Sequence, residues 1–554
     1  MTRFYSKAII ALTISIFTTF ISLGNSPENL QKAWDAFNRN QRTEARELFV
    51  KASASASTKA EANLGLAMLA WSEENNQKAF GFIEKFYESA ENPFPYLYAL
   101  WSTGMMFNGF SNKKTDYQLK FLQKISQDKR LNGTMKAMID EAMGNHYENA
   151  NKAQQAAIEY AKIGAIENWQ VLGTFENTSG SGFNKDFGAL AHPESYIFKN
   201  KVNANVTWFK PPVERSDKWF NFTYNFIHDN SIMYAQTFLQ SSDNQEVIMR
   251  SGCSGSMKIW VNDVLITNEI IERNCDLDVY NNTVKLQKGY NRILVQIGES
   301  EAGRANFLIR MTDKEGNLVQ GLSSTATLQA YTKATPYDSV TIPFFAEDFF
   351  INKVKSEPNS LLNYILLAET YLRNDKAYES RKFLKKAREL APESTFLSGV
   401  MIEAYSREQN QTELTKEGEF IKNKDPESYW GIQMAVNEAM KKEDYAETEL
   451  LLEKIKKAYG VSRYTEFTEL GILAKQQKYD EMMKLSEKLY KAYPDSPETV
   501  NLAYVIEKDV RKNPKAANAV LNKFIENNYH DKTIIELANI HFNNGEKEEG
   551  IQKF

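Results

Sequence analysis

The sequence predicts a multidomain protein that mixes α and β structure: an N-terminal α-helical repeat domain, a central antiparallel β-sandwich and a C-terminal α-solenoid. Three observations support this prediction. Helix breakers recur with a fixed period near the C-terminus, polar and apolar residues alternate in the middle, and Ala-rich helical pairs precede them. We expect a signal peptide at 1–24, helical repeats at 26–166, a sandwich at 167–345 and a solenoid at 346–554.

The period in the C-terminal third is 34 residues. Three prolines are separated by this distance, a fourth follows two periods later, and a glycine occupies the skipped position: Pro358, Pro392, Pro426, Pro494 and Gly460. Residues 361–373 and 377–390 carry apolar side chains at helical spacing and are joined by the polar turn 374–376. The repeating unit is therefore predicted to be a pair of helices.

This unit resembles the tetratricopeptide repeat, so the C-terminal domain is expected to be a tetratricopeptide α-solenoid. The residues that match its packing positions in the first full unit are Tyr364, Leu367, Ala368, Tyr371, Leu384, Ala387 and Pro392, whereas Ser380 departs from the usual Ala. Four units are followed by a fifth whose second helix has barely begun at Phe554. We interpret the chain as the N-terminal part of a longer polypeptide, the alternative being a short last helix.

The resemblance also implies a binding groove lined by the first helix of each unit. Glu369, Glu403 and Asn437 share one groove-facing position at 34-residue intervals. Polar side chains in register can hold an extended peptide through its backbone. The groove is predicted to bind protein or peptide partners, while each residue taken alone is interpreted as simply solvated.

The segment 26–166 is predicted to be a divergent, tetratricopeptide-like stack. Alanines and aromatics recur at helix-hairpin spacing near its start, namely Ala33, Phe37, Ala45, Phe49 and Ala52. The insert 92–114 interrupts the period.

Residues 1–24 are typical of an export signal. Arg3 and Lys7 supply positive charge, and 8–23 is uncharged and mainly apolar. The alternative is a signal anchor or an ordinary buried helix. The run is short for a membrane span. There is no Cys near the cleavage point, which argues against a lipid anchor. We expect a periplasmic or secreted protein without a stable membrane span after cleavage.

The middle segment 167–345 is predicted to form an antiparallel sandwich from short alternating runs. The pair Asn262-Asp263 suits the left-handed backbone of a tight hairpin, and Gly289 supplies another turn. Along 292–297, alternate residues are expected to face opposite sides of the sheet.

Several runs resemble galactose-binding-like jelly-roll modules. The matching runs are 258–263, 289–295, 169–175 and 192–194, with Asp263 in place of a usual Gly. The matching residues are largely structural, so the resemblance predicts the fold better than it predicts a ligand. Trp208 and Trp219 are candidate platforms for a glycan, although most aromatic residues on sandwich strands belong to the core.

Cys253 and Cys275 are predicted to form a disulfide if the chain is exported. Such a loop would contribute roughly 3 kcal/mol by the chain-entropy model. The alternative is a pair of buried thiols.

Charge and composition exclude several classes of function. The 554 residues include 67 basic and 71 acidic side chains, a net charge of -4, which gives no basic excess for nucleic acid. Five His and two Cys leave few nucleophiles, general bases or zinc ligands. We expect no enzyme activity, no cofactor and no metal site, and we interpret His192 and His228 as hydrogen-bonded or exposed.

The whole arrangement resembles the front part of Bacteroidota extracytoplasmic proteins, some of which continue into a transglutaminase-like domain. The sequence predicts a non-catalytic scaffold or adaptor that binds protein through its solenoids and that docks a domain or holds a glycan through its sandwich. One alternative is a carbohydrate-binding protein. Another is the recruitment half of a larger transglutaminase-like enzyme.

Overall fold

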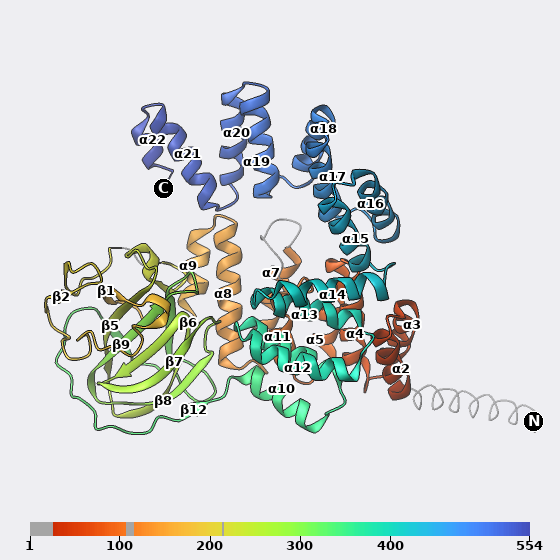
Figure 1. The fold of residues 1–554 in the computed structure, drawn as a ribbon. Helices are drawn as coiled ribbons and strands as arrows, with labels where there is room; N and C mark the ends of the chain where they lie inside the picture. The colour runs from red at the N-terminus through yellow and green to blue at the C-terminus, as the bar shows by residue number, and fades with distance from the viewer. Residues whose placement is uncertain (1–25, 107–115, 213–214, 554) are drawn as a thin grey trace, which may run out of the picture. The chain divides into compact units, whose positions relative to one another are not determined.

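The computed structural model describes residues 26–106, 116–212 and 215–553. The predicted signal peptide lies outside these residues. The described chain divides into two compact units, each assembled from distant segments. Unit 1 comprises the described residues within 1–109, 350–372 and 377–511, and unit 2 those within 110–349, 373–376 and 512–554. Helices at both ends of the sequence and an antiparallel sheet between them confirm the predicted α plus β class (Figure 1).

The N-terminal helices form antiparallel pairs. Their bounds are α2 (Ser26–Asn38), α3 (Arg42–Ala52), α4 (Lys59–Ser72), α5 (Asn76–Ser89), α6 (Phe94–Leu100), α7 (Asp116–Ile125), α8 (Gly133–Asn149) and α9 (Ala153–Ala161). Close crossings depend on small residues, because Gly65 lies against the ring of Phe49, where an added Cβ would be 2.4 Å away. Asn40 and Glu74, 34 residues apart, both adopt left-handed backbone at the turns inside the first two pairs.

The C-terminal helices repeat the same design more regularly. Their bounds are α10 (Phe345–Ser356), α11 (Leu361–Arg373), α12 (Ala377–Leu390), α13 (Thr395–Arg407), α14 (Gln411–Lys424), α15 (Tyr429–Lys441), α16 (Tyr445–Tyr459), α17 (Arg463–Lys475), α18 (Tyr479–Ala492), α19 (Pro497–Val505), α20 (Pro514–Ile525), α21 (Asp531–Asn543) and α22 (Lys547–Ile551). Among the described residues, no helix has the length and apolar character of a membrane span.

Two local features recur along the C-terminal repeats. The side chains of Ser394, Ser428 and Ser462 accept a hydrogen bond from the backbone N–H three residues on, and so cap α13, α15 and α17. The turn inside each pair contains a left-handed residue, and these residues are also 34 positions apart: Asp375, Gln409, Glu443 and Gln477. The periodic prolines therefore accompany a capping serine and a left-handed turn.

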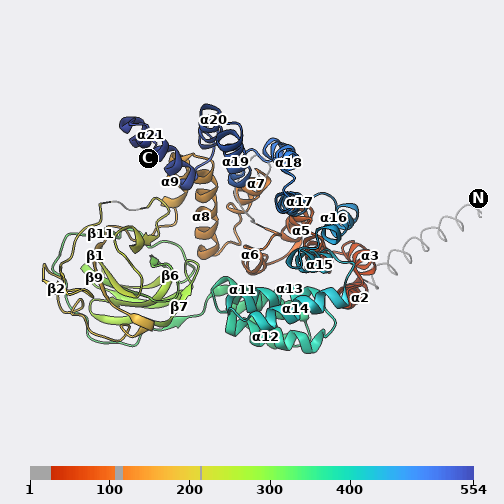
Figure 2. The ribbon, with the colours of Figure 1, turned by 45° about the horizontal axis from the view of Figure 1, so that its top comes forward.

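Within the described residues, ten strands form one antiparallel sheet in unit 2. They are β1 (Gln170–Glu176), β4 (Phe220–Asn221), β5 (Ser231–Ser241), β6 (Gln245–Val261), β7 (Val264–Asn274), β8 (Tyr280–Leu286), β9 (Gly289–Glu299), β10 (Asn306–Thr312), β11 (Ser323–Thr325) and β12 (Thr341–Ile342). The short strands β2 (Phe198–Lys199) and β3 (Asn205–Val206) pair separately. Figure 2 shows the strands curving around a common interior.

Strand β6 belongs to both layers of this curved sheet. Its first half pairs with β8 and β10, and its second half pairs with β7 and β9. The change of partner coincides with Gly255, whose φ of 115° lies in the region that favours glycine. An added Cβ there would be 2.6 Å from the carbonyl oxygen of Gly298. The sheet bends at this position, and a bulge in the pairing with β7 follows.

The sheet and the helical pair α8–α9 are joined through buried polar groups inside unit 2. Arg310 on β10 pairs with Asp278, and the hydroxyl of Thr134 on α8 donates to the same carboxylate at 2.7 Å. The guanidinium also donates to the carbonyl oxygen of Gly133 at 3.0 Å. Helix α8 is therefore part of the sheet's own unit.

The last helices of the chain also belong to unit 2, where they contact the turn after α8. The backbone N–H of Tyr529 donates to the carbonyl oxygen of Asn149 at 3.0 Å, and the Asn151 amide donates to the carbonyl oxygen of Ile525 at 3.0 Å. In Figure 1, α20 and α21 accordingly lie near the end of α8.

Candidate functional sites

In unit 1 the N-terminal pairs pack against the C-terminal stack through aromatic rings. Phe37 of α2 lies 5.0 Å from Phe396 of α13, measured between ring centroids. Trp71 of α4 lies 5.6 Å from Phe396 and 5.7 Å from Trp430 of α15. Part of the C-terminal stack is thus covered by the chain's own N-terminal helices.

Polar contacts fix the same packing. The side-chain amide of Asn40 donates to the carbonyl oxygen of Glu393 at 2.7 Å, and its oxygen accepts from the backbone N–H of Thr395 at 3.0 Å. Arg42 forms an ion pair with Asp425 in the next inter-repeat turn. The turn after α2 therefore contacts the turns that begin α13 and α15.

The structure brings together two of the three predicted groove residues. Glu369 on α11 is only 6% exposed, and its pKa is raised by burial first and by the charge of Glu403 second. Glu403 on α13 pairs with Arg407 at 3.0 Å. Asn437 on α15 is exposed. Glu369 is therefore largely withdrawn from solvent, whereas Asn437 is open to a ligand.

A recess of about 490 Å³ opens elsewhere in unit 1, between α2, α4 and the turn that precedes α11. We call it the acidic recess. Its polar wall carries three carboxylates, Asp35, Glu61 and Glu357, together with amide side chains such as Asn38. Its apolar wall contains Trp34 and the leucines Leu30, Leu361, Leu362 and Leu390. These residues come from the N-terminal helices and from the first helices of the C-terminal stack.

The acidic recess has an excess of hydrogen-bond acceptors. The Trp34 indole N–H donates to Glu61 Oε1 at 2.7 Å. The pKa of Glu61 is raised mainly by burial in the acidic recess. The hydrogen bond from Trp34 opposes this shift, and the charge of Glu357 adds to it. Lys353 pairs with Glu357 at 2.9 Å and lowers the pKa of that carboxyl. The side-chain oxygen of Asn38 is buried and has no hydrogen-bond partner.

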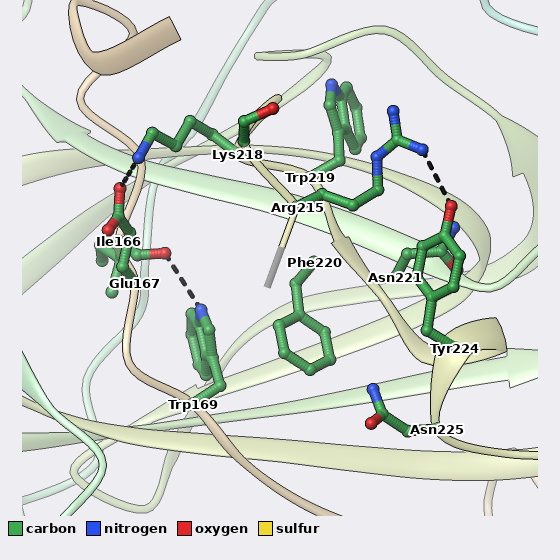
Figure 3. A pocket seen from close by; sticks show the side chains of 11 residues that line it. Ile166, Glu167, Trp169, Arg215, Lys218, Trp219, Phe220, Asn221, Tyr224 and Asn225 are labelled. Atoms are coloured by element: carbon green, nitrogen blue, oxygen red, sulfur yellow. Dashed lines mark hydrogen bonds and ion pairs between the residues drawn. The ribbon is translucent and has the colours of Figure 1, made fainter. Parts of the chain in front are cut away.

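A second pocket, of about 240 Å³, lies in unit 2 beside β4 (Figure 3). Trp219 lines it, with its indole N–H donating to Glu141 Oε1 of α8 at 2.6 Å. Lys218 pairs with Glu167 at one side, and Arg215 donates to the hydroxyl of Tyr224 at the other, at 2.8 Å. We call it the aromatic pocket.

The two predicted glycan platforms differ in exposure. Trp208 is 6% exposed and belongs to a hydrophobic core with Phe175 and Tyr234, and its indole N–H donates to the carbonyl oxygen of His192. The ring of Trp208 therefore packs in the core and is not open to a sugar. Trp219 is half-buried in the wall of the aromatic pocket, and Tyr224, which the same pocket contains, is 62% exposed.

Cys253 and Cys275 are free, buried thiols, which differs from the predicted disulfide. They are neighbours in the sheet, because the Cys275 N–H donates to the Cys253 carbonyl oxygen at 2.9 Å. Their sulfur atoms have separate partners, since Cys253 Sγ contacts Gly255 O and Cys275 Sγ contacts Tyr280 Oη, each at 3.4 Å. Burial raises the pKa of both thiols, that of Cys275 to about 12, so neither is an activated nucleophile.

Comparison of the chain with models of known protein families gave no match, and comparison with curated proteins gave none either. The function of the protein is therefore inferred from the geometry of these sites.

Sequence reasoning missed the acidic recess. Glu357 lies hundreds of residues after Trp34 and Glu61 in the chain, and no motif connects it with them. The contact between the N-terminal pairs and the C-terminal stack is what brings them to one wall.

Proposed function

We propose that the protein is a non-catalytic extracytoplasmic scaffold or adaptor. Its tetratricopeptide-like repeats bind a protein or peptide partner, and its galactose-binding-like sandwich docks another domain or holds a glycan. The repeats at 34-residue spacing support the first part, because serine caps and left-handed turns recur at that period. Stacked helical pairs of this kind offer extended surfaces to which a peptide can bind.

The observation that carries the proposal is the acidic recess. Its leucine wall suits an aliphatic stem, and its acceptors suit a cationic head, which together describe a Lys or Arg side chain. The indole of Trp34 beside Glu61 adds an aromatic face that attracts a cation. Among the described residues, Lys353 is a cation that acts on Glu61, and Glu357 already pairs with it. The recess therefore favours a basic residue flanked by apolar ones.

A peptide library displayed on phage and selected against the purified chain tests this function. Enriched peptides should share a basic residue next to apolar ones, and Glu61→Gln combined with Glu357→Gln should weaken their binding about tenfold or more by fluorescence anisotropy. The matched control is Glu44→Gln with Glu419→Gln, which removes two exposed carboxylates of the same unit away from the recess. Equal losses in both double variants, or no enriched sequence at all, would reject the recess as the site.

A carbohydrate-binding function is the second candidate, and the aromatic pocket favours it. Exposed Tyr224 and half-buried Trp219 present rings beside the polar side chains of Arg215, Asn221 and Asn225. Rings stack on the apolar faces of sugars, while such polar groups suit sugar hydroxyls. A glycan array probed with the whole chain should show saccharide binding that falls in Tyr224→Ala and persists in Trp208→Phe. An array without a reproducible ligand would remove this candidate.

The export of the protein and its part in a larger transglutaminase-like enzyme are further proposals that depend on the resemblances in the sequence. Cell fractionation with an antibody to the chain tests the first. The second predicts that the reading frame encodes a catalytic Cys, His and Asp in a further domain, which sequencing of the transcript would show.

A further inference from the structure

Three side chains of the types that ligate metals meet at one edge of the sheet in unit 2. His228 and Asp229 lie in the turn before β5, and Glu299 ends β9. One imidazole nitrogen and two carboxylate oxygens from these residues all lie within 4.8 Å of one another. The three residues come from segments that pair as neighbouring antiparallel strands, since Ser231 faces Glu299 in the register.

Glu299 is the buried residue of the three. It is 3% exposed, and its two carboxylate oxygens accept the backbone N–H groups of Asn230 at 3.2 Å and Gly303 at 3.0 Å. These bonds fix the carboxylate and leave lone pairs on both oxygens. In the described part of the chain, no Lys or Arg forms an ion pair with it. A cation bound beside this buried carboxylate would therefore offset part of the cost of burying its charge.

The side chains of His228 and Asp229 are available to coordinate an ion. His228 Nε2 lies 3.8 Å from Asp229 Oδ1, which is too long for a hydrogen bond, and the His228 side chain is 22% exposed. The Asp229 side chain is 77% exposed and can rotate toward Glu299. Lys201 holds the turn by donating to the carbonyl oxygen of Asp229 and to the hydroxyl of Ser231, without pairing with either carboxylate.

We propose that His228, Asp229 and Glu299 bind one divalent transition-metal ion, with Zn²⁺ as the best match. Zinc accepts one imidazole nitrogen and two carboxylate oxygens at about 2.0–2.2 Å and leaves a fourth position for water. Ca²⁺ fits less well because it prefers six to eight oxygen ligands. The two carboxylates balance the charge of the ion. This proposal differs from the sequence-based interpretation of His228 as a hydrogen-bonded or exposed residue.

The ion would join the turn before β5 to the turn after β9. His228 and Gly303 also line a polar cleft of about 640 Å³, together with Arg304 and Asp217. A metal at this edge would therefore stabilise two of the segments that form the cleft. Its binding does not depend on whether the acidic recess holds a peptide.

Isothermal titration of the tag-free, EDTA-treated and dialysed chain with ZnCl₂ tests the site. We expect one equivalent to bind, a rise in the unfolding temperature on addition of Zn²⁺, and a weaker response to CaCl₂. His228→Ala and Asp229→Asn should each weaken Zn²⁺ binding at least tenfold. Asp229→Asn changes an exposed side chain, so loss of folding does not complicate its result. With Co²⁺, the visible absorption of a tetrahedral site should appear in the parent chain and disappear in His228→Ala.

The matched control is His192→Ala, because His192 lies in the same unit and pairs with Glu194 at 2.9 Å. This variant should bind Zn²⁺ like the parent chain. The proposal is overturned if no saturable binding occurs, or if His228→Ala and Asp229→Asn bind as tightly as the parent. Loss of binding in His192→Ala alone would place the ion elsewhere.

Discussion

Arg310 and Asp278 face each other through two parallel hydrogen bonds, Nε to Oδ1 at 2.8 Å and Nη2 to Oδ2 at 2.5 Å. Both side chains are almost completely buried, at 2% and 0% exposure. The carboxylate of Asp278 also accepts a hydrogen bond from the hydroxyl of Thr134. The guanidinium of Arg310 also donates to backbone carbonyl groups. A charge pair at the contact between α8 and the sheet is thus fully satisfied.

Replacing Asp278 by Ala should destabilise unit 2 severely. The variant leaves the Arg310 charge buried without its partner, and breaking such a pair typically costs about 3–5 kcal/mol. Hydrogen exchange of the whole chain should show lost protection in α8 and β10 while α13 and α15 in unit 1 keep theirs. Asp278→Leu with Arg310→Met removes both charges and should recover part of the loss. Equal protection in the parent and Asp278→Ala would contradict the role of the pair.

Gly133→Ala tests the same contact sterically. An added Cβ would lie 1.9 Å from the carbonyl oxygen of Gly316, which is backbone and cannot rotate away. We expect a fall in soluble yield and in the unfolding temperature. Gly81→Ala in α5 is the matched control, since nothing lies within 4 Å of its added Cβ and Ala favours a helix over Gly by about 1 kcal/mol. The control should therefore be neutral or stabilising, and a similar response in both variants would argue against the close approach.

The sequence predicted the fold class because each class of element has its own period. The prolines at 34-residue spacing indicated the C-terminal pairs, and alternation along 292–297 indicated a strand that the structure places in β9. No such period predicts that α8 and α20–α22 belong to the same unit as the sheet. Their place in that unit depends on tertiary contacts such as Thr134 with Asp278, which join residues far apart in the chain.

The candidate sites were harder to predict for the same reason. Trp219 was predicted as a candidate glycan platform, but no pattern in the sequence connects it with its partner Glu141 on α8. Trp208 carries the same side chain and is part of the core. His228 gave no ligand spacing, because the carboxylate of Glu299 reaches it through strand pairing. Burial and pairing, which decide these roles, are not visible in residue order.

Asn40→Gly should loosen the packing of the N-terminal pairs in unit 1. Asn40 has a left-handed backbone with φ of 63°, which Gly also adopts, so the variant removes only the side-chain hydrogen bonds to Glu393 and Thr395. The cost should be about 1–2 kcal/mol because Thr395, which is buried, loses its bonds to the Asn40 oxygen. Faster hydrogen exchange at the start of α13 checks this. Asn437→Gly, at an exposed helical position, should not affect exchange at that segment.

Glu141→Gln should change how stability depends on pH. Burial raises the pKa of Glu141 from 4.5 to about 7; nearby Asp276 and Asp217 add to the shift, and the Trp219 hydrogen bond and Arg373 oppose it. The folded state therefore binds the proton more tightly than the unfolded state. The stabilisation is complete below pH 4.5 and is lost as the pH rises to about 7.

Gln keeps the hydrogen bond from Trp219 and cannot ionise, so it avoids this loss. Relative to the parent, the Gln variant should gain up to about 3 kcal/mol between pH 4 and pH 8, at 1.36 kcal/mol per pKa unit. Urea unfolding of both chains at several pH values, followed by tryptophan fluorescence, measures the difference. Glu246→Gln, which changes an exposed carboxyl on β6, is the control and should follow the parent. Parallel pH profiles for the parent and Glu141→Gln would contradict the prediction, because Glu141 would then be ionised in the folded state at neutral pH. In that case the orientation of Trp219 would depend on a buried charge.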